Sequence, residues 1–201
     1  MIVPEAFYTR KDVVLIAREL LGKVLVSEAD GIRTAGMIVE TEAYAGATDR
    51  ASHAYGNRRT PRTEIMYGMG GTAYVYLCYG IHHLVNVVTN VKDTPHAVLI
   101  RGLEPLEGVE DMMLRRKKSG PDASLTAGPG ALSQALGIRT AHTGQSLRGP
   151  LIYIEDRQID IEPRQIVAAT RVGVAYAGED ALLPYRFYIR GNPFVSKGKG
   201  L

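Results

Sequence analysis

The sequence predicts an α+β fold in which peripheral helices surround an antiparallel sheet. Runs rich in β-branched and aromatic residues alternate with turn signals along the chain. Strands mostly follow strands through short turns, a pattern typical of antiparallel neighbours and not of βαβ units. No repeat or linker divides the 201 residues, so we expect a single domain over 1–201.

Helices are expected at four places. The first begins at Thr9, where Asp12 three residues later completes a capping-box-like pattern, and it ends at Gly22. The other three are expected over 60–67, 107–118 and 131–136.

Strands account for most of the remaining chain. Asp30-Gly31 is a strong signal for a hairpin that joins strands over 23–27 and about 33–44. The stretch 45–62 is polar and basic and is expected to be a long loop. A second hairpin turns at Tyr79-Gly80. The remaining strands are expected over 72–78, 81–90, 96–103, 151–154, 165–172 and 185–189.

The composition excludes several classes of function. Cys78 is the only cysteine, which excludes an internal disulfide and a CxxC metal or redox site. The chain has no Walker loop or strand-linked GxGxxG, and its histidines lack neighbouring ligands, so we expect no metal and no cofactor. It has no apolar run of ~18 residues and no apolar leader, so we expect an intracellular protein of the cytoplasm or nucleoid with no membrane contact.

Positive charge gathers in three clusters, although the formal net charge is only +3. Arg58, Arg59 and Arg62 form the first, and residues 115–118 form the second. The third comprises Arg186, Arg190, Lys197 and Lys199. Solvated helix ends and tails are one interpretation, and a positive face for a polyanion is the other.

Two carboxylates and a tyrosine share one face of the expected strand that ends at Tyr44. Glu40, Glu42 and Tyr44 are two residues apart, so their side chains point the same way. One interpretation is an edge strand that uses charge against aggregation. The other is a site, in which the acids bind metal or one acid is a general base. His53 in the following loop is either a ligand contact or a surface histidine.

Tyrosines are concentrated in one segment. Six of the 11 lie between Tyr44 and Tyr79. Tyr74 and Tyr76 share a face of the second hairpin, where cross-strand packing explains them. Tyr79 lies at the turn, where a ring has little to pack against, and this position suits a wedge inserted into a base stack.

Seven sequence blocks follow one another over nearly the whole chain, from about Ala6 to Ser196. They are IVETEAYAG, DRASHAYGNRRTPR, GGTAYVYLCYGIHHLVNVV, VLIRGLEPLEG, GPGALSQALGI, RVGVAYAG and RFYIRGNPFVS. In identity and order these blocks resemble the alkyladenine-type 3-methyladenine DNA glycosylases. The resemblance implies a mixed domain around a curved antiparallel sheet, with a protruding hairpin.

The resemblance also implies roles for individual residues. Glu42 matches the catalytic carboxylate that activates the attacking water. Tyr79 matches the residue inserted through the minor groove, and Arg101 matches an arginine near the reaction centre and the DNA backbone. The base pocket is matched by Tyr44, His53, Tyr76 and Asn86, of which Asn86 disfavours normal guanine.

The activity implied is that of a monofunctional hydrolase that cleaves N-glycosidic bonds. It would flip alkylated or deaminated purines out of double-stranded DNA and excise them, which initiates base excision repair. The protein would act as a monomer without a cofactor, with Tyr79, Arg58, Arg59 and Arg62 on the DNA. Two alternatives stay open from the residues: a non-catalytic nucleic-acid-binding domain and a free-nucleoside hydrolase.

Overall fold

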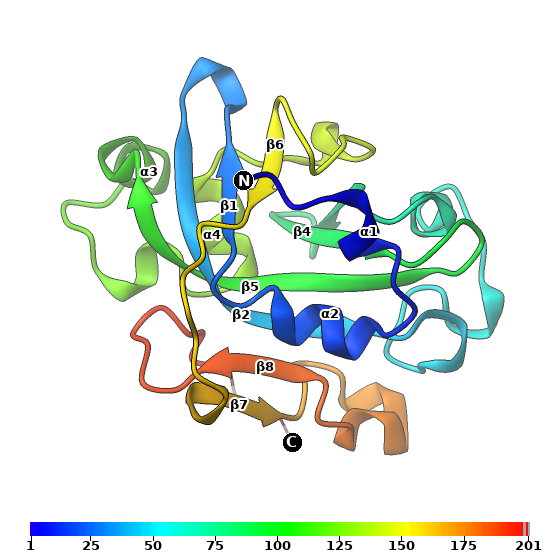
Figure 1. The fold of residues 1–201 in the computed structure, drawn as a ribbon. Coiled ribbons are helices and arrows are strands. Elements are labelled where there is room, and N and C mark those ends of the chain that lie inside the picture. Colours follow the sequence, from blue (N-terminus) through cyan, green and yellow to red (C-terminus); the bar gives the residue numbers. More distant parts are fainter. Residues whose placement is uncertain (199, 201) are drawn as a thin grey trace.

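Two long strands form the middle of an eight-stranded antiparallel sheet in the computed structural model, which describes residues 1–198 and 200 (Figure 1). The sheet order is β3-β4-β5-β2-β1-β6, and β8 lies between β2 and β7. The strands are β1 Val24–Ser27, β2 Thr34–Tyr44, β3 Ala73–Cys78, β4 His82–Thr89, β5 His96–Glu107, β6 Ile152–Glu155, β7 Ile166–Ala169 and β8 Arg186–Ile189. This arrangement confirms the predicted α+β class and its antiparallel sheet.

β2 is the central strand because it is paired along both edges. β5 pairs with one edge, while β1 and β8 share the other. The edge-strand interpretation of Glu40 and Glu42 is therefore wrong. Its physical basis fails because these acids lie where three strands meet and neither is exposed.

In the described part of the chain four short α-helices flank the sheet: α1 Glu5–Tyr8, α2 Val13–Glu19, α3 Val109–Arg116 and α4 Pro129–Ala135. The predicted start of the first long helix at Thr9 is wrong. Asp12 is the N-cap of α2 and accepts hydrogen bonds from the backbone N–H groups of Val14 and Leu15 at 3.0 and 2.9 Å. Thr9 instead ends α1.

Other predicted boundaries shift for identifiable reasons. The helix expected over 60–67 is a 3₁₀ turn, Glu64–Tyr67. The helix expected from Glu107 begins two residues later because β5 continues as far as Glu107. β7 stops at Ala169, short of the predicted 172, because the chain leaves the sheet to bury Arg171.

The main core lies between the sheet and its helices. Ile16 of α2 and Leu20, the C-cap residue of this helix, are fully buried in it. The Thr41 hydroxyl donates to the carbonyl of Ala17 at 2.8 Å, so alternate residues of β2 face α2. Glu40, Glu42 and Tyr44 therefore face away from α2. Among the described residues no helix is both long and apolar enough to span a membrane.

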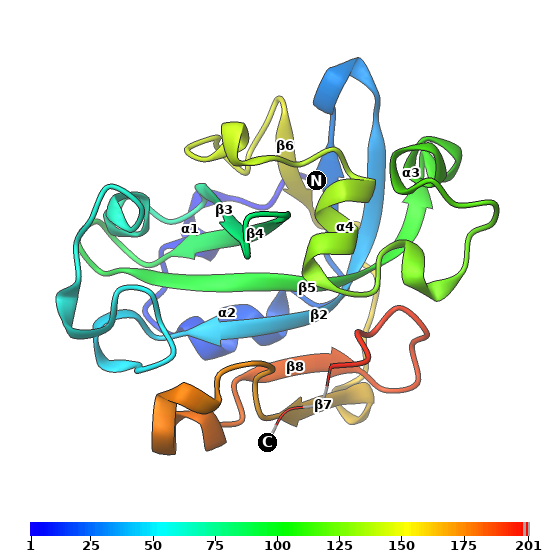
Figure 2. The same ribbon diagram turned by 180° about the vertical axis from the view of Figure 1, so that it is seen from behind.

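The hairpin β3–β4 projects from the sheet toward α4 (Figure 2). Its connection consists of Tyr79, Gly80 and Ile81, and the Ile81 N–H donates to the Cys78 carbonyl at 3.1 Å. The two central residues of this turn, Tyr79 and Gly80, have φ of +50° and +73°. Positive φ at both central residues is the geometry of a type I′ turn, which matches the twist of the flanking strands. The Tyr79 ring is 92% exposed at the tip. Leu77 and Ile81 are exposed on either side of it.

Candidate active site

The residues of the site lie along one row of cross-strand pairs that runs over four strands. Glu42 of β2 is paired with Leu99 of β5, Leu99 with Asn86 of β4, and Asn86 with Tyr74 of β3. Directly paired residues project from the same face of a sheet. The carboxylate, the amide and a tyrosine ring are therefore aligned on the face opposite α2.

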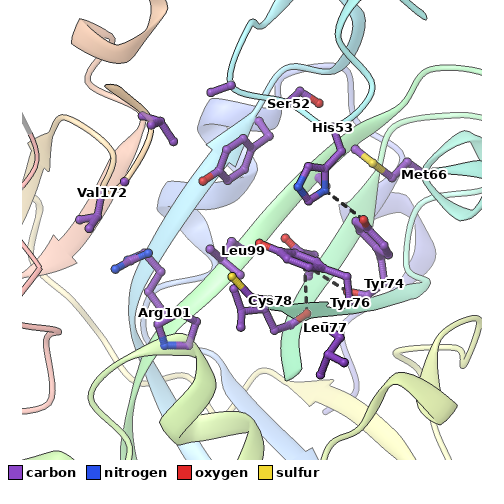
Figure 3. Close-up of a pocket in the computed structure, with 18 of the residues that line it drawn as sticks. Ser52, His53, Met66, Tyr74, Tyr76, Leu77, Cys78, Leu99, Arg101 and Val172 are labelled. Atoms are coloured by element: carbon purple, nitrogen blue, oxygen red, sulfur yellow. Dashed lines mark hydrogen bonds between the residues drawn. The ribbon is translucent and has the colours of Figure 1, made fainter. Parts of the chain in front are cut away.

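A cavity of about 430 Å³ opens on this face (Figure 3). This volume lies within the range of about 300–1,000 Å³ that is usual for small-molecule sites. The structure brings the sequence-predicted base-contacting residues together around it: Tyr44, His53, Tyr76, Asn86 and Arg101. Tyr79 and Arg62 also line it. Their roles stay predictions.

Three aromatic rings form one wall of the cavity. The Nδ1 atom of His53 is 3.0 Å from the Tyr74 hydroxyl, and its ring meets Tyr76 edge-on with centroids 4.8 Å apart. Burial, assisted by Arg62 and Arg58, lowers the pKa of His53 to about 4. The wall therefore presents a neutral imidazole at neutral pH, with one nitrogen as donor and the other as acceptor.

Asn86 is fixed in orientation by the strands that carry it. Its amide Nδ2 donates to the carbonyls of Tyr74 and Leu84 at 3.1 and 3.3 Å. Both hydrogens of the amide are thus directed at backbone oxygens, and the carbonyl oxygen is left as its group for a ligand.

Glu42 is fully buried, and its carboxylate is held by three donors. The backbone N–H of Val172 donates to Oε1 at 2.7 Å, and the Tyr44 hydroxyl donates to Oε2 at 2.8 Å. The Nε atom of Arg101 lies 3.4 Å from Oε1. Burial and the neighbouring Glu42 raise the pKa of Tyr44 well above its usual value. This hydroxyl therefore stays protonated and donates a hydrogen bond to Glu42.

Glu40 has a different environment, although it lies on the same face of β2. It accepts from Arg186 Nε at 2.7 Å, Arg101 Nε at 3.1 Å and the backbone N–H of Ser196 at 2.6 Å. Neither acid is itself among the residues that line the cavity, but Tyr44, Arg101 and Val172, which donate to Glu42, are among them. The interpretation of Glu40 and Glu42 as a metal-binding pair is not supported, because both carboxylates are directed at the Arg101 guanidinium.

Arg101 reaches both acids because of an irregularity in β5. Glu40 is paired with Gly102 and Thr41 with Ile100, so Arg101 is the extra residue of a β-bulge. A bulge redirects the side chain of its extra residue, and bulges recur beside active sites. Burial acts to lower the pKa of Arg101, but Glu42 and Glu40 outweigh it and the pKa is raised. The guanidinium is thus a permanent cation between two anions.

Sequence reasoning missed the ion pair between Arg171 and Asp49. Arg171 is completely buried, and its Nη1 and Nη2 atoms donate to Asp49 Oδ2 and Oδ1 at 2.5 and 2.9 Å. Its guanidinium also lies 4.9 Å from the centroid of the Tyr44 ring. Arg171 precedes Val172, so it helps to place two donors of Glu42. The one available signal was the arginine of the RVGVAYAG block, and local pattern does not distinguish a buried arginine from an exposed one.

The predicted DNA-contacting arginines have different surroundings. Arg62 lies over the Tyr76 ring, 4.9 Å from its centroid, and Arg58 lines a neighbouring groove. Arg59 is turned toward Glu64 and Asp93, at 2.7 and 3.0 Å. It does not line the cavity.

The third predicted basic cluster is not a single surface feature. Arg186 is buried against Glu40, where it balances an internal charge. Lys199 lies outside the described residues.

Removing the charge of Arg171 should destabilise the fold strongly. We expect Arg171→Met to lower the free energy of unfolding by about 3–5 kcal/mol, because the buried Asp49 carboxylate would lose the cation that balances its charge. Urea denaturation measures the loss. Arg33→Met, at a half-exposed ion-pair network, serves as the control and should cost no more than about 1 kcal/mol. Equal losses in the two variants would contradict the importance of the buried pair.

The depressed pKa of His53 should make stability depend on pH. The unfolded histidine titrates near pH 6.5 and the folded one near 4, so unfolding takes up a proton between these values. Stability should therefore decline as the pH falls from 6.5 to 4. We expect a shallower decline in His53→Gln, measured by denaturant titrations across this range. Parallel curves for the two proteins would show that His53 is not the group responsible.

Comparison with known proteins identifies the family of the chain. Residues 6–193 match the model of the family described as methylpurine-DNA glycosylase. Three relatives carry the name "Putative 3-methyladenine DNA glycosylase". The Clostridium perfringens strain 13 protein is 48% identical over 95% of this chain and 97% of its own. The Bacillus cereus strain G9842 protein is 45% identical over 98% of this chain and 100% of its own. The Clostridium acetobutylicum protein is 49% identical over 94% of this chain and 95% of its own.

These matches confirm the resemblance seen in the sequence blocks. The chain belongs to the methylpurine-DNA glycosylase family and is a DNA-repair enzyme that hydrolyses N-glycosidic bonds.

Proposed function

We propose that this DNA glycosylase flips an alkylated or deaminated purine out of duplex DNA into the 430 Å³ cavity and hydrolyses its glycosidic bond with Glu42. One observation carries the proposal. Among the residues that the structure describes, the three that donate to the Glu42 carboxylate, namely Tyr44, Arg101 and Val172, also line the cavity. A base held in the cavity therefore brings its sugar toward this carboxylate.

The aromatic wall suits an electron-poor ring. A purine methylated at N3 carries positive charge, which is attracted to the faces of tyrosine rings. Tyr76 and Tyr44 supply such rings, and the neutral His53 adds a hydrogen bond without repelling the charge. Asn86 is held by two backbone carbonyls, so its side chain keeps a fixed place and restricts the room for the exocyclic amino group of guanine.

The chemical step requires one carboxylate. Glu42 takes a proton from water as the water oxygen bonds to the anomeric carbon, and the electrons of the breaking bond go to the departing base. The anionic carboxylate also stabilises the positive charge that develops on the sugar. A cationic base departs as a neutral molecule, so 3-methyladenine needs no general acid. Hypoxanthine, which is neutral, needs a proton from solvent.

The product of this step is an intact abasic site. Strand cleavage by a glycosylase requires an amine that forms a Schiff base with the sugar. Among the residues that the structure describes, no lysine lines the cavity. This composition of the lining favours a monofunctional enzyme. Separately, family resemblance leads us to expect a monomer.

The hairpin tip supports duplex DNA as the substrate. Extruding a base costs a few kcal/mol, and a side chain that fills the vacated space offsets part of this cost. Tyr79, flanked by the exposed Leu77 and Ile81, provides an apolar tip narrow enough for the minor groove. A free-nucleoside hydrolase has no use for such a tip, and membership of an enzyme family argues against a non-catalytic binding domain.

Replacing Glu42 by glutamine should abolish excision and spare binding. The amide keeps the shape of the side chain but cannot deprotonate water, so we expect single-turnover base release to fall by at least about 10²–10⁴-fold. Affinity for lesion-bearing duplex should change little. Glu162→Gln, at an exposed glutamate remote from the cavity lining, is the matched control. Excision by Glu42→Gln at the wild-type rate would refute the assignment.

Replacing Tyr79 by alanine should impair extrusion from duplex DNA only. We expect affinity for a lesion in duplex to fall about tenfold. This corresponds to the loss of one base–aromatic stacking contact, which contributes roughly 1–3 kcal/mol. Base release from a single-stranded oligonucleotide needs no wedge and should be unchanged. Tyr79→Phe keeps the ring and should behave as wild type. Equal losses on duplex and single strand would argue for a general binding role instead.

A further inference from the structure

A second cavity adjoins the first and shares a wall with it. This groove has a volume of about 330 Å³. The residues that line both spaces form the shared wall: Ser52, His53, Arg62 and Tyr176. Any molecule that occupies the base cavity and extends into the groove must pass over these four residues.

The groove has the chemistry of a phosphodiester site. Three arginines line it, Arg50, Arg58 and Arg62, together with hydroxyl groups such as that of Thr60. No acidic side chain is part of its lining in the described chain. Guanidinium groups are the preferred protein partners of phosphate oxygens.

We propose that Tyr176 forms the subsite for the deoxyribose of the flipped nucleotide, an inference that rests on the proposed function. In a nucleotide the sugar joins the base to the phosphate. With the base in the first cavity and the phosphate at the arginines of the groove, the sugar lies over the shared wall. Of that wall, Tyr176 offers an exposed aromatic side chain: the residue is 71% exposed, whereas the other ring, His53, is partly buried.

The ring of Tyr176 is held in place despite this exposure. Its hydroxyl donates to the carbonyl of Ala51 at 3.1 Å. It also lies four residues beyond Val172, whose N–H binds Glu42, so one short segment supplies both groups.

An exposed aromatic face in this place suits a sugar. Deoxyribose presents mainly C–H groups, which pack on a ring without a demand for charge or hydrogen bonds. Contact with the ring would hold the anomeric carbon on the side of Glu42. The competing explanation is structural, namely that the hydroxyl only ties the segment after Val174 to the loop at Ala51.

The test uses a duplex that contains a tetrahydrofuran abasic-site analogue, which keeps the sugar and phosphates but has no base. We expect Tyr176→Ala to bind it about tenfold more weakly than wild type, the loss of one aromatic contact. Binding of undamaged duplex of the same sequence should change less than twofold. Single-turnover excision should fall by a similar factor of about ten, since the sugar is less well held.

Two companion variants separate the ring from the rest of the segment. Tyr176→Phe removes the bond to Ala51 but keeps the ring, and it should bind the analogue as wild type does. Leu182→Ala removes an exposed apolar side chain of the same 3₁₀ segment, Ala175–Leu182, that lines neither cavity, and it should have no effect. Thermal melting of each variant establishes that it is folded.

Three results would overturn the proposal. One is unchanged binding of the analogue by Tyr176→Ala. Another is an equal loss in Tyr176→Phe, which would identify the hydroxyl anchor as the cause. The third is an equal loss on undamaged duplex, which would indicate a general backbone contact. Because analogue binding needs no catalysis, these results are distinct from failure of the proposed function, which would show as excision by Glu42→Gln.

Discussion

Six buried and mutually paired charges hold the site, and the surrounding structure is arranged to keep them paired. Taking a carboxylate out of water costs several kcal/mol unless protein groups replace its hydration. Here each carboxylate oxygen accepts at least one hydrogen bond, and the formal charges cancel. The carboxylates are Glu40, Glu42 and Asp49, and the guanidinium groups are Arg101, Arg171 and Arg186. The guanidinium groups come from β5, from the segment after β7 and from β8, so a shift of any one segment would leave a buried charge unpaired.

This arrangement explains why Glu42 has one fixed geometry. Its donors come from three parts of the chain: the end of β2, the bulge of β5 and the segment after β7. A carboxylate oriented before substrate arrives does not have to reorganise when charge develops on the sugar, and such preorganisation is a major source of catalytic power. Glu40 binds Arg101 and the backbone at Ser196, and in this way it holds in position the arginine that contacts Glu42.

Much of the fold and part of the site could be predicted from the sequence. Turn residues and strand-type runs located both hairpins, because these signals are local. Strand alternation placed Glu40 and Glu42 on one face, but it could not show that β2 is central, since pairing with β8 depends on residues 140 and more positions away. The roles of Glu42 and the pocket residues came from family resemblance. Asp49, Arg171 and Tyr176 were missed because burial of a charge and exposure of a ring are set by tertiary contacts.

The turn at Tyr79 has a consequence for how the enzyme searches DNA. A tyrosine with positive φ is held in a conformation that costs roughly 1–2 kcal/mol. The short connection is also closed by the hydrogen bond from the Ile81 N–H to the Cys78 carbonyl. In the proposed function the tip therefore needs little ordering when it meets the duplex. Each base pair would then meet the same preformed tip, and discrimination between damaged and undamaged positions would rest on how readily the pair opens.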